Sequence, residues 1–205
     1  MNGRIYLDFD DVIAETGRGI IEMAQREFQT KVQFDEITNY NLQVSLDMED
    51  DEFERLVQML HSHELLMNLE PIPDAIQGIR DLKDSGFEMS ILTGRPPSTE
   101  VVTRQWLERH EVPCDRLMFV DKYSRTISNA HGHGGVTLEE LKTMSFDLAI
   151  EDSDTMAVFL SEQMNLPVLL HDRPWNRHLD TKGTRIQRCQ NWQDMRPHFH
   201  ALLKN

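Results

Sequence analysis

The stretch IYLDFDDV, residues 5–12, decides how this 205-residue chain is interpreted. Its first three residues form a short apolar run typical of a buried strand, and three acids follow within four positions: Asp8, Asp10 and Asp11. Asp8 and Asp10 are two positions apart, so both side chains can project towards one site where the strand loosens into a loop. Crowded carboxylates repel one another unless a cation neutralises them, and magnesium is a hard ion that binds such oxygens. A solvated acidic turn would also explain this stretch, so the rest of the chain must decide between the two interpretations.

Further apolar runs have the length and the flanking residues of buried strands; they cover 87–92, 117–120, 148–150 and 167–170. Helical patterns separate them, such as the one that begins at Ala75 and ends at Gly86. Ser98 is expected to cap the next helix, and Thr137 begins a capping box for a short helix that reaches Lys142. The alternation predicts an α/β fold, a doubly wound parallel sheet with helices on both faces.

One long segment interrupts this alternation. The first and second predicted strands are about 75 residues apart, far more than a simple crossover needs. The segment contains helical patterns at 16–28 and around Phe53 to Leu60. We predict a small helical cap of residues 14–70, inserted into a core domain formed by residues 1–13 and 71–205. Such a cap would lie over the carboxyl ends of the strands, where open parallel sheets bind ligands.

Composition narrows the classes of function. The formal net charge of −14 argues against a nucleic-acid polymer as partner, because phosphate backbones recruit basic surfaces. We find no apolar run of membrane-spanning length and no secretory leader pattern. Two cysteines cannot form a disulfide framework. We therefore expect a cytoplasmic protein that does not bind membranes.

Two later strand ends also carry polar groups. The second predicted strand ends in Thr93, Gly94 and Arg95, and a hydroxyl, a flexible backbone and a guanidinium can together hold a phosphate. The fourth ends in Glu151 and Asp152, which puts a second acidic cluster at the same edge of the sheet. Lys142 lies just before that strand and could neutralise both a carboxylate and a phosphate.

Taken in order, LDFDD, ILTGR, Lys142 and IEDSDT resemble the four motifs of the haloacid dehalogenase superfamily. Within it, the helical insertion, the TGR sequence and DRPWN at 172–176 resemble the 5′(3′)-deoxyribonucleotidases and their bacterial relatives. The resemblance implies a magnesium-dependent phosphomonoester hydrolase with an aspartyl-phosphate intermediate and a nucleoside monophosphate as the favoured substrate.

The resemblance also implies roles for the acids. Asp8 would be the nucleophile and a metal ligand. Asp10 would be the general acid and base, and would give the metal its backbone carbonyl. Asp152 would complete the metal site, and Glu151 would support it, either through a water molecule or from behind the ligands.

Thr93 would bind the phosphoryl group, with Gly94 and Arg95 beside it. Lys142 would steady the nucleophile and the transferring group. Lys122 competes for that role, because it follows the third predicted strand and could instead reach the substrate phosphate. We favour Lys142 because it lies ten positions before the last acidic motif.

Other interpretations remain open. The chain could be a phosphatase for another small metabolite, or a regulatory domain that accepts or binds phosphate without turnover. Receiver domains use similar residues, but their acceptor Asp follows a middle strand and they lack a large cap. The sequence leaves the oligomeric state open, so a homo-oligomer is possible.

Some local features could have either a functional or a purely structural role. Asp11 is expected to be an acid at a helix start without a catalytic part. Trp175 could stack on a base or simply pack. The segment His131–Gly135 could bind a transition metal, but a surface loop is the preferred interpretation. Substrate specificity is expected from cap residues such as Tyr40, Leu66 and Met67.

Overall fold

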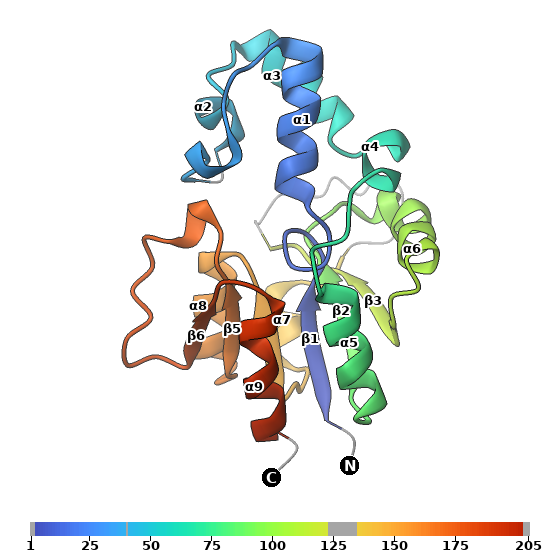
Figure 1. Cartoon of the computed structure of the whole chain (residues 1–205), viewed down its shortest axis with the longest axis vertical. Helices are drawn as coiled ribbons and strands as arrows, with labels where there is room; N and C mark the ends of the chain where they lie inside the picture. Colours follow the sequence, from blue (N-terminus) through green and yellow to red (C-terminus); the bar gives the residue numbers. More distant parts are fainter. Residues whose placement is uncertain (1–2, 40, 123–134, 203–205) are drawn as a thin grey trace.

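The computed structural model describes residues 3–39, 41–122 and 135–202. Six strands form one parallel sheet in the order β3-β2-β1-β4-β5-β6, so the first strand lies near its centre (Figure 1). The strands are β1 (Arg4–Asp8), β2 (Glu88–Thr93), β3 (Arg116–Phe119), β4 (Leu148–Glu151), β5 (Val168–His171) and β6 (Ile186–Cys189). The predicted α/β class with a parallel sheet is confirmed.

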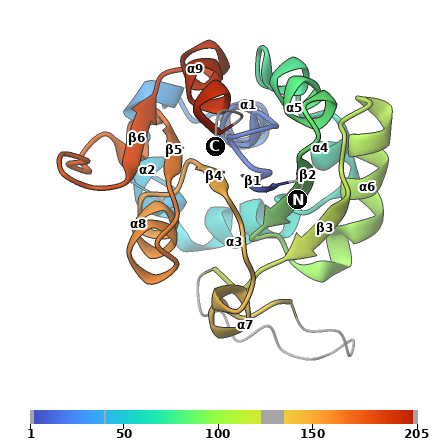
Figure 2. The ribbon, with the colours of Figure 1, turned by 90° about the horizontal axis from the view of Figure 1, so that it is seen from below.

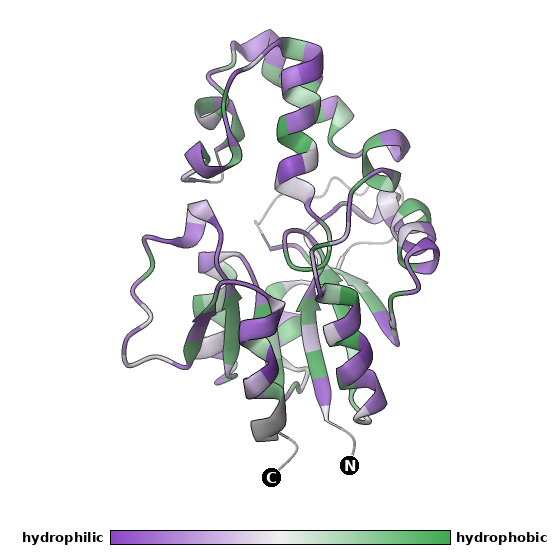
Figure 3. Ribbon diagram, viewed as in Figure 1, coloured by the Kyte–Doolittle hydropathy of each residue, from purple (hydrophilic) through white to green (hydrophobic). Residues whose placement is uncertain are grey.

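Helices cover both faces of the sheet (Figure 2). One face carries α5 (Ala75–Asp84), α6 (Glu100–Arg109) and α9 (Trp192–Leu202), and the other carries α7 (Leu138–Lys142) and α8 (Asp154–Gln163). The alternation along β1 divides the core, because Ile5 and Leu7 face the first group of helices and Tyr6 faces the second. All three are fully buried, and the strands are hydrophobic throughout most of the sheet (Figure 3).

A group of helices stands beyond the carboxyl ends of the strands (Figure 1). They are α1 (Thr16–Phe28), α2 (Leu42–Ser45), α3 (Asp50–Met59) and α4 (His63–Met67), and we call them the cap. The cap has an apolar core of its own, which includes Ile21, Met23 and Leu56. Two hydrogen bonds join the two segments of chain that connect the cap to the core. Glu15 N–H donates to Glu70 O at 2.9 Å, and Ile72 N–H donates to Ile13 O at 2.8 Å.

The cap rests on the core at two places. Helix α4 packs on α6, where the Trp106 indole donates to Leu69 O at 2.9 Å. On the other side, the 3-10 turn η1 (Phe34–Glu36) contacts the turn η3 (Pro174–Asn176) that follows β5. The cap is therefore supported on both sides of the strand ends.

Helices α5 and α9 lie side by side on one face of the sheet (Figures 1 and 2). Gly78 of α5 lies against the indole of Trp192, and a Cβ at this glycine would overlap the ring. The absence of a side chain at this position allows the two helices to approach closely.

Some local predictions are confirmed and one is wrong. The capping box at Thr137 is present, and Gly86 takes the left-handed conformation, with φ of 92°, just after α5. Ser98 does not cap α6, because Pro97 begins a 3-10 turn (Pro97–Thr99) and the helix starts only at Glu100. Among the residues that the structure describes, no helix is both long and apolar enough to cross a membrane.

Candidate active site

The loops that follow β1, β2 and β4 meet at one edge of the sheet. Asp8 is the last residue of β1 and pairs with Leu92 of β2, and Leu7 pairs with Ile150 of β4. Parallel strands end at the same edge, so this register brings Asp8, Thr93 and Glu151 together, although they are far apart in the sequence.

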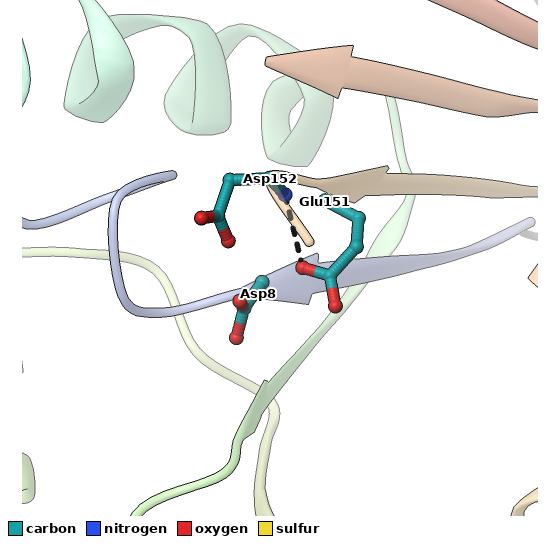
Figure 4. A group of neighbouring side chains, drawn as sticks. All are labelled: Asp8, Glu151 and Asp152. Carbon is teal, nitrogen blue, oxygen red and sulfur yellow. Dashed lines mark hydrogen bonds between the residues drawn. The ribbon is translucent and has the colours of Figure 1, made fainter. Parts of the chain in front are cut away.

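Three carboxylates gather where β1 and β4 end (Figure 4). One oxygen each from Asp8, Glu151 and Asp152 lies within 4.8 Å of the others. All three residues are buried, and the Asp152 N–H donates to Glu151 Oε2 at 3.1 Å. The prediction that the two acidic motifs converge is confirmed by this geometry.

Lys122 lies between two of these carboxylates. Its Nζ is 2.8 Å from Asp8 Oδ1 and 2.9 Å from Glu151 Oε1, and its side chain is only 2% exposed. Asp8 Oδ1 also accepts from the Phe9 N–H at 2.7 Å. One ammonium among three carboxylates gives the cluster a net charge of −2 when all three acids are ionised.

The electrostatics of the cluster favour an added cation. Burial raises the pKa of Glu151 well above its usual value, the Asp8 charge raises it further, and Lys122 opposes both. Burial also raises the pKa of Asp152, and Asp8 and Glu151 add to the rise. Carboxylate oxygens that are short of positive charge form the donor set that a hard divalent cation prefers. The residues present therefore fit Mg²⁺.

Asp10 has a different environment. Its Oδ1 accepts from Arg95 Nη2 at 2.7 Å and from the Thr16 hydroxyl at 2.6 Å, and its Oδ2 accepts from the Thr93 hydroxyl at 3.0 Å. Burial by itself would raise the pKa of Asp10, but the Arg95 guanidinium and these hydrogen bonds outweigh it and lower the pKa below its usual value. Asp10 is thus held in its ionised form.

The three residues predicted to hold phosphate differ in position. The Thr93 side chain is fully buried, and its hydroxyl also accepts from the Arg95 N–H at 3.1 Å. Arg95 pairs with Asp10 and lies over the Phe9 ring, with its guanidinium carbon 4.2 Å from the ring centroid. Gly94 and Arg95 line the same pocket as Asp8, whereas Thr93 is not among its lining residues.

The structure brings Lys122, and not Lys142, to Asp8. Lys142 is the last residue of α7; its Nζ pairs with Glu139 of the same helix at 2.8 Å and lies over the Phe159 ring. The preceding residue, Leu141, is fully buried, and successive residues of a helix are about 100° apart, so Lys142 faces another direction. This geometry corrects our choice between the two lysines.

Cap residues form the far wall of the pocket. Ile20, Leu60, His61 and Leu66 line it opposite the carboxylates. Of the predicted specificity residues, Leu66 is in this wall, Met67 packs against the main apolar core, and Tyr40 lies outside the described residues. Sequence reasoning missed Ile20 and Leu60, because an apolar residue that faces a pocket has the same pattern as one that faces a core.

Asp11 behaves as the predicted acid at a helix start. Both of its carboxylate oxygens accept from the Gly17 N–H in the first turn of α1, at 2.9 and 3.1 Å. Burial raises the pKa of Asp11 to about 7, and Arg173 and the Gly17 N–H partly oppose the rise. Residues 131–134 of the histidine-glycine segment lie outside the described residues.

Comparison with known proteins identifies the family. The family model described as "5' nucleotidase, deoxy (Pyrimidine), cytosolic type C protein" (NT5C) matches residues 2–201. The chain belongs to the NT5C family. It is a haloacid dehalogenase superfamily hydrolase of the phosphatase or nucleotidase kind, and its substrate is a small phosphate ester. The predicted superfamily and enzyme class are thus confirmed.

Relatives of this NT5C-family protein span nearly the whole chain. The "Putative nucleotidase BH1399" of Halalkalibacterium halodurans is 24% identical over 98% of this chain and 94% of its own length. A HAD family hydrolase from Deinococcus radiodurans, solved with phosphate and sodium, has a TM-score of 0.64 at 14% identity and covers 98% of this chain and 97% of its own. The HAD hydrolase YfnB of Bacillus subtilis, solved with magnesium, has a TM-score of 0.61 at 15% identity and covers 98% and 100%. The two solved structures share the fold of this chain.

Proposed function

We propose that this protein is a magnesium-dependent nucleotidase that hydrolyses a nucleoside monophosphate through a phosphoryl group carried on Asp8. One observation carries the proposal: the Asp8 carboxylate lines a pocket beside Lys122 and within 4.8 Å of two further carboxylates. The family and the name of its relative from Halalkalibacterium halodurans support the nucleotidase activity.

Asp8, Asp152 and the Asp10 carbonyl would hold Mg²⁺, with Glu151 behind them. When bound, the ion would offset the charge of the carboxylates and of the phosphate dianion. Lys122 supplies a fixed positive charge next to the attacking oxygen. An anionic nucleophile can approach an anionic phosphate only where such charges are already in place.

Asp10 would serve the proton transfers. Its pairing with Arg95 favours the carboxylate, which is the form that takes a proton from water when the phosphoryl-enzyme is hydrolysed. Protonation of the leaving group in the first step requires the carboxylic acid. A bound phosphate dianion would favour that form, because it competes with Asp10 for the Arg95 guanidinium.

The cap wall suits an organic leaving group. Ile20, Leu60 and Leu66 offer apolar contact to a base or sugar, and His61 can form a hydrogen bond there. The core domain would then bind the phosphate group, and the cap residues would determine which ester binds.

A screen of phosphate esters with Mg²⁺ tests this function. Nucleoside monophosphates should be hydrolysed with kcat/KM at least about tenfold above sugar and polyol phosphates, and EDTA should abolish turnover. A higher kcat/KM for a sugar phosphate would contradict the proposed substrate, but it would not contradict the phosphate-ester hydrolase activity.

Two variants test the intermediate. Asp8→Asn should be inactive, because an amide does not attack phosphorus. Asp10→Asn keeps the backbone carbonyl but loses the base, so the second step should slow by about 10²–10⁴. With an activated aryl phosphate it should trap phosphate on Asp8, which rapid quench and peptide mass spectrometry detect. Full activity of Asp8→Asn would rule out this nucleophile.

A further inference from the structure

The segment after β5 makes three hydrogen bonds to two parts of the active site. Asn176 donates to Asp152 O at 2.7 Å, and Arg173 donates to Asp11 O at 3.1 Å. Trp175 Nε1 donates to the Asp152 carboxylate, at Oδ2, over 2.9 Å. One short turn therefore holds both the loop after the nucleophile and the carboxylate at the end of β4.

The same turn contacts the cap. The Trp175 ring meets the Phe34 ring of η1 edge to face, with centroids 5.5 Å apart. Phe34 is held from another side by Arg18 of α1, whose guanidinium carbon is 4.2 Å from the ring centroid. Arg177 reaches Asp35 of η1 at 3.5 Å. Trp175 is thus in direct contact with both the Asp152 carboxylate and the cap.

We infer that Trp175 is a positioning residue that fixes the Asp152 carboxylate for the cation and makes cation binding depend on the position of the cap. The inference rests on the proposed function, because it concerns the magnesium site of that function.

Burial and charge support this assignment. Trp175 is 5% exposed and Asp152 is 5% exposed, so water has little access to replace the indole donor. A hydrogen bond to an ionised carboxylate is stronger than one between neutral groups. A donor on Oδ2 restricts the rotation of this carboxylate, which is one of the three in the candidate cation cluster. Loss of such supporting donors typically costs about 10–100-fold in metal affinity.

The contact between Trp175 and the cap makes cation binding depend on the position of the cap. The same indole packs on the Phe34 ring and donates to the Asp152 carboxylate. If η1 moves away with the cap, the indole loses that support and the carboxylate loses its fixed donor. Closure over a substrate would then strengthen cation binding, and by linkage the cation would favour closure.

Calorimetric titration with MgCl₂, without substrate, tests the inference independently of turnover. Trp175→Phe keeps a ring against Phe34 but removes the donor, and its Mg²⁺ affinity should fall about tenfold. Phe34→Leu keeps the donor but weakens its support, and should cost about threefold. Trp106→Phe is the matched control, since Trp106 is also buried and donates to a carbonyl, Leu69 O; its affinity should stay within about twofold of the wild type.

Unchanged affinity in Trp175→Phe, or an equal loss in Trp106→Phe, would overturn the positioning role. Unchanged affinity in Phe34→Leu would overturn the link to the cap. If the wild type binds no Mg²⁺, that result contradicts the metal site of the proposed function, and the present inference is contradicted with it.

A second measurement covers the case in which Trp175→Phe does not fold. The wild-type chain labelled with 5-fluorotryptophan gives fluorine resonances for its three tryptophans. The Trp175 resonance should shift with Mg²⁺ at the concentration that calorimetry gives, while that of Trp106 stays in place. A Trp175 resonance that ignores saturating Mg²⁺ would overturn the inference.

Discussion

The carboxylates of the site differ in how their charges are balanced. Asp10 has Arg95 as its own partner, whereas Asp8, Glu151 and Asp152 share Lys122 within their cluster. Two unit charges 4 Å apart interact by about 4 kcal/mol at an effective dielectric constant of 20. Lys122 is therefore central to the assembly of the cluster, and in the proposed reaction it would stabilise the transferring phosphoryl group.

Replacing each lysine in turn tests this assignment. Lys122→Met should lower kcat by about 10²-fold or more, as the loss of a fixed positive group at a developing charge usually does. Lys142→Met is the matched control, because its ammonium pairs only with Glu139 among the contacts seen, and its kcat should change less than about twofold. Steady-state kinetics at saturating ester measures both. A larger loss in Lys142→Met would return the catalytic role to that residue.

His171 gives the molecule a pH-dependent stability. Burial lowers the pKa of His171 to about 3, and the Arg173 charge adds to the effect. The unfolded chain takes up this proton near pH 6.5 and the folded chain does not, so stability is complete above pH 6.5 and falls as the pH drops towards 3. The slope for one such group is at most about 1.4 kcal/mol per pH unit.

His171→Asn should remove this slope. The Asn amide can still donate to Asp11 O, which His171 Nδ1 contacts at 2.8 Å. Between pH 7 and pH 5 the wild type should lose about 2 kcal/mol more unfolding free energy than the variant. Urea denaturation at the two pH values measures the difference, with the exposed His63→Asn as control. Equal losses in the wild type and His171→Asn would exclude this histidine as the source.

The acids and the Thr-Gly-Arg turn of the site could be predicted from the sequence, because each follows an apolar run that can only be a buried strand. The lysine could not be chosen by distance along the chain. Its choice depends on the direction that each residue of a five-residue helix faces, and successive residues are about 100° apart. The apolar side chain of Leu141 was the available signal, because it predicts that Leu141, and not Lys142, faces the interior. The donor role of Trp175 had no signal, because it depends on a contact between distant loops.

The close approach of helices α5 and α9 depends on a single glycine, Gly78. Gly78→Ala would gain up to about 1 kcal/mol from helix propensity but would force the Trp192 ring to move, and overpacking costs about 1–3 kcal/mol. The net effect should be a destabilisation of about 1–2 kcal/mol by urea denaturation, with kcat unchanged. Gln77→Ala, the exposed neighbour, should be neutral or slightly stabilising. A gain of stability in Gly78→Ala would show that the helices separate easily.

The sequence predicted five of the six strands; it missed the last strand and the last helix, and in the cap it missed the short helices α2 and α4. β6 pairs only with β5 at the edge of the sheet, and its middle residues, Gln187 and Arg188, are polar, so it lacks the apolar run of an inner strand. Helix α9 contains Pro197, a residue that usually indicates a break. Tertiary packing, through Trp192 and Phe199, overrides that local preference.

For the molecule as a whole, Mg²⁺ should act as a stabilising ligand. A cation that binds only the folded chain adds about 2.7 kcal/mol at one hundred times its Kd. For a chain of this size each kcal/mol raises Tm by about 2–4 °C, so the rise should be about 5–10 °C. Differential scanning calorimetry with and without MgCl₂ measures it. Asp152→Asn should lose most of the rise, and a variant that keeps it would place the ion elsewhere.

The central place of β1 in the sheet has a consequence for synthesis of the protein. Ile5 pairs with Met89 on one side and with Leu148 on the other, and the Trp192 indole donates to Val12 O from 180 residues away. At translation rates of about 5–20 residues per second, the first strand leaves the ribosome on the order of ten seconds before its second neighbour exists. During that interval its apolar edge is open to other chains, and chaperones are the natural protection. A nascent chain released before residue 152 would contain Asp8 but would lack Asp152, one of the three carboxylates of the cluster, so we expect it not to hydrolyse an ester.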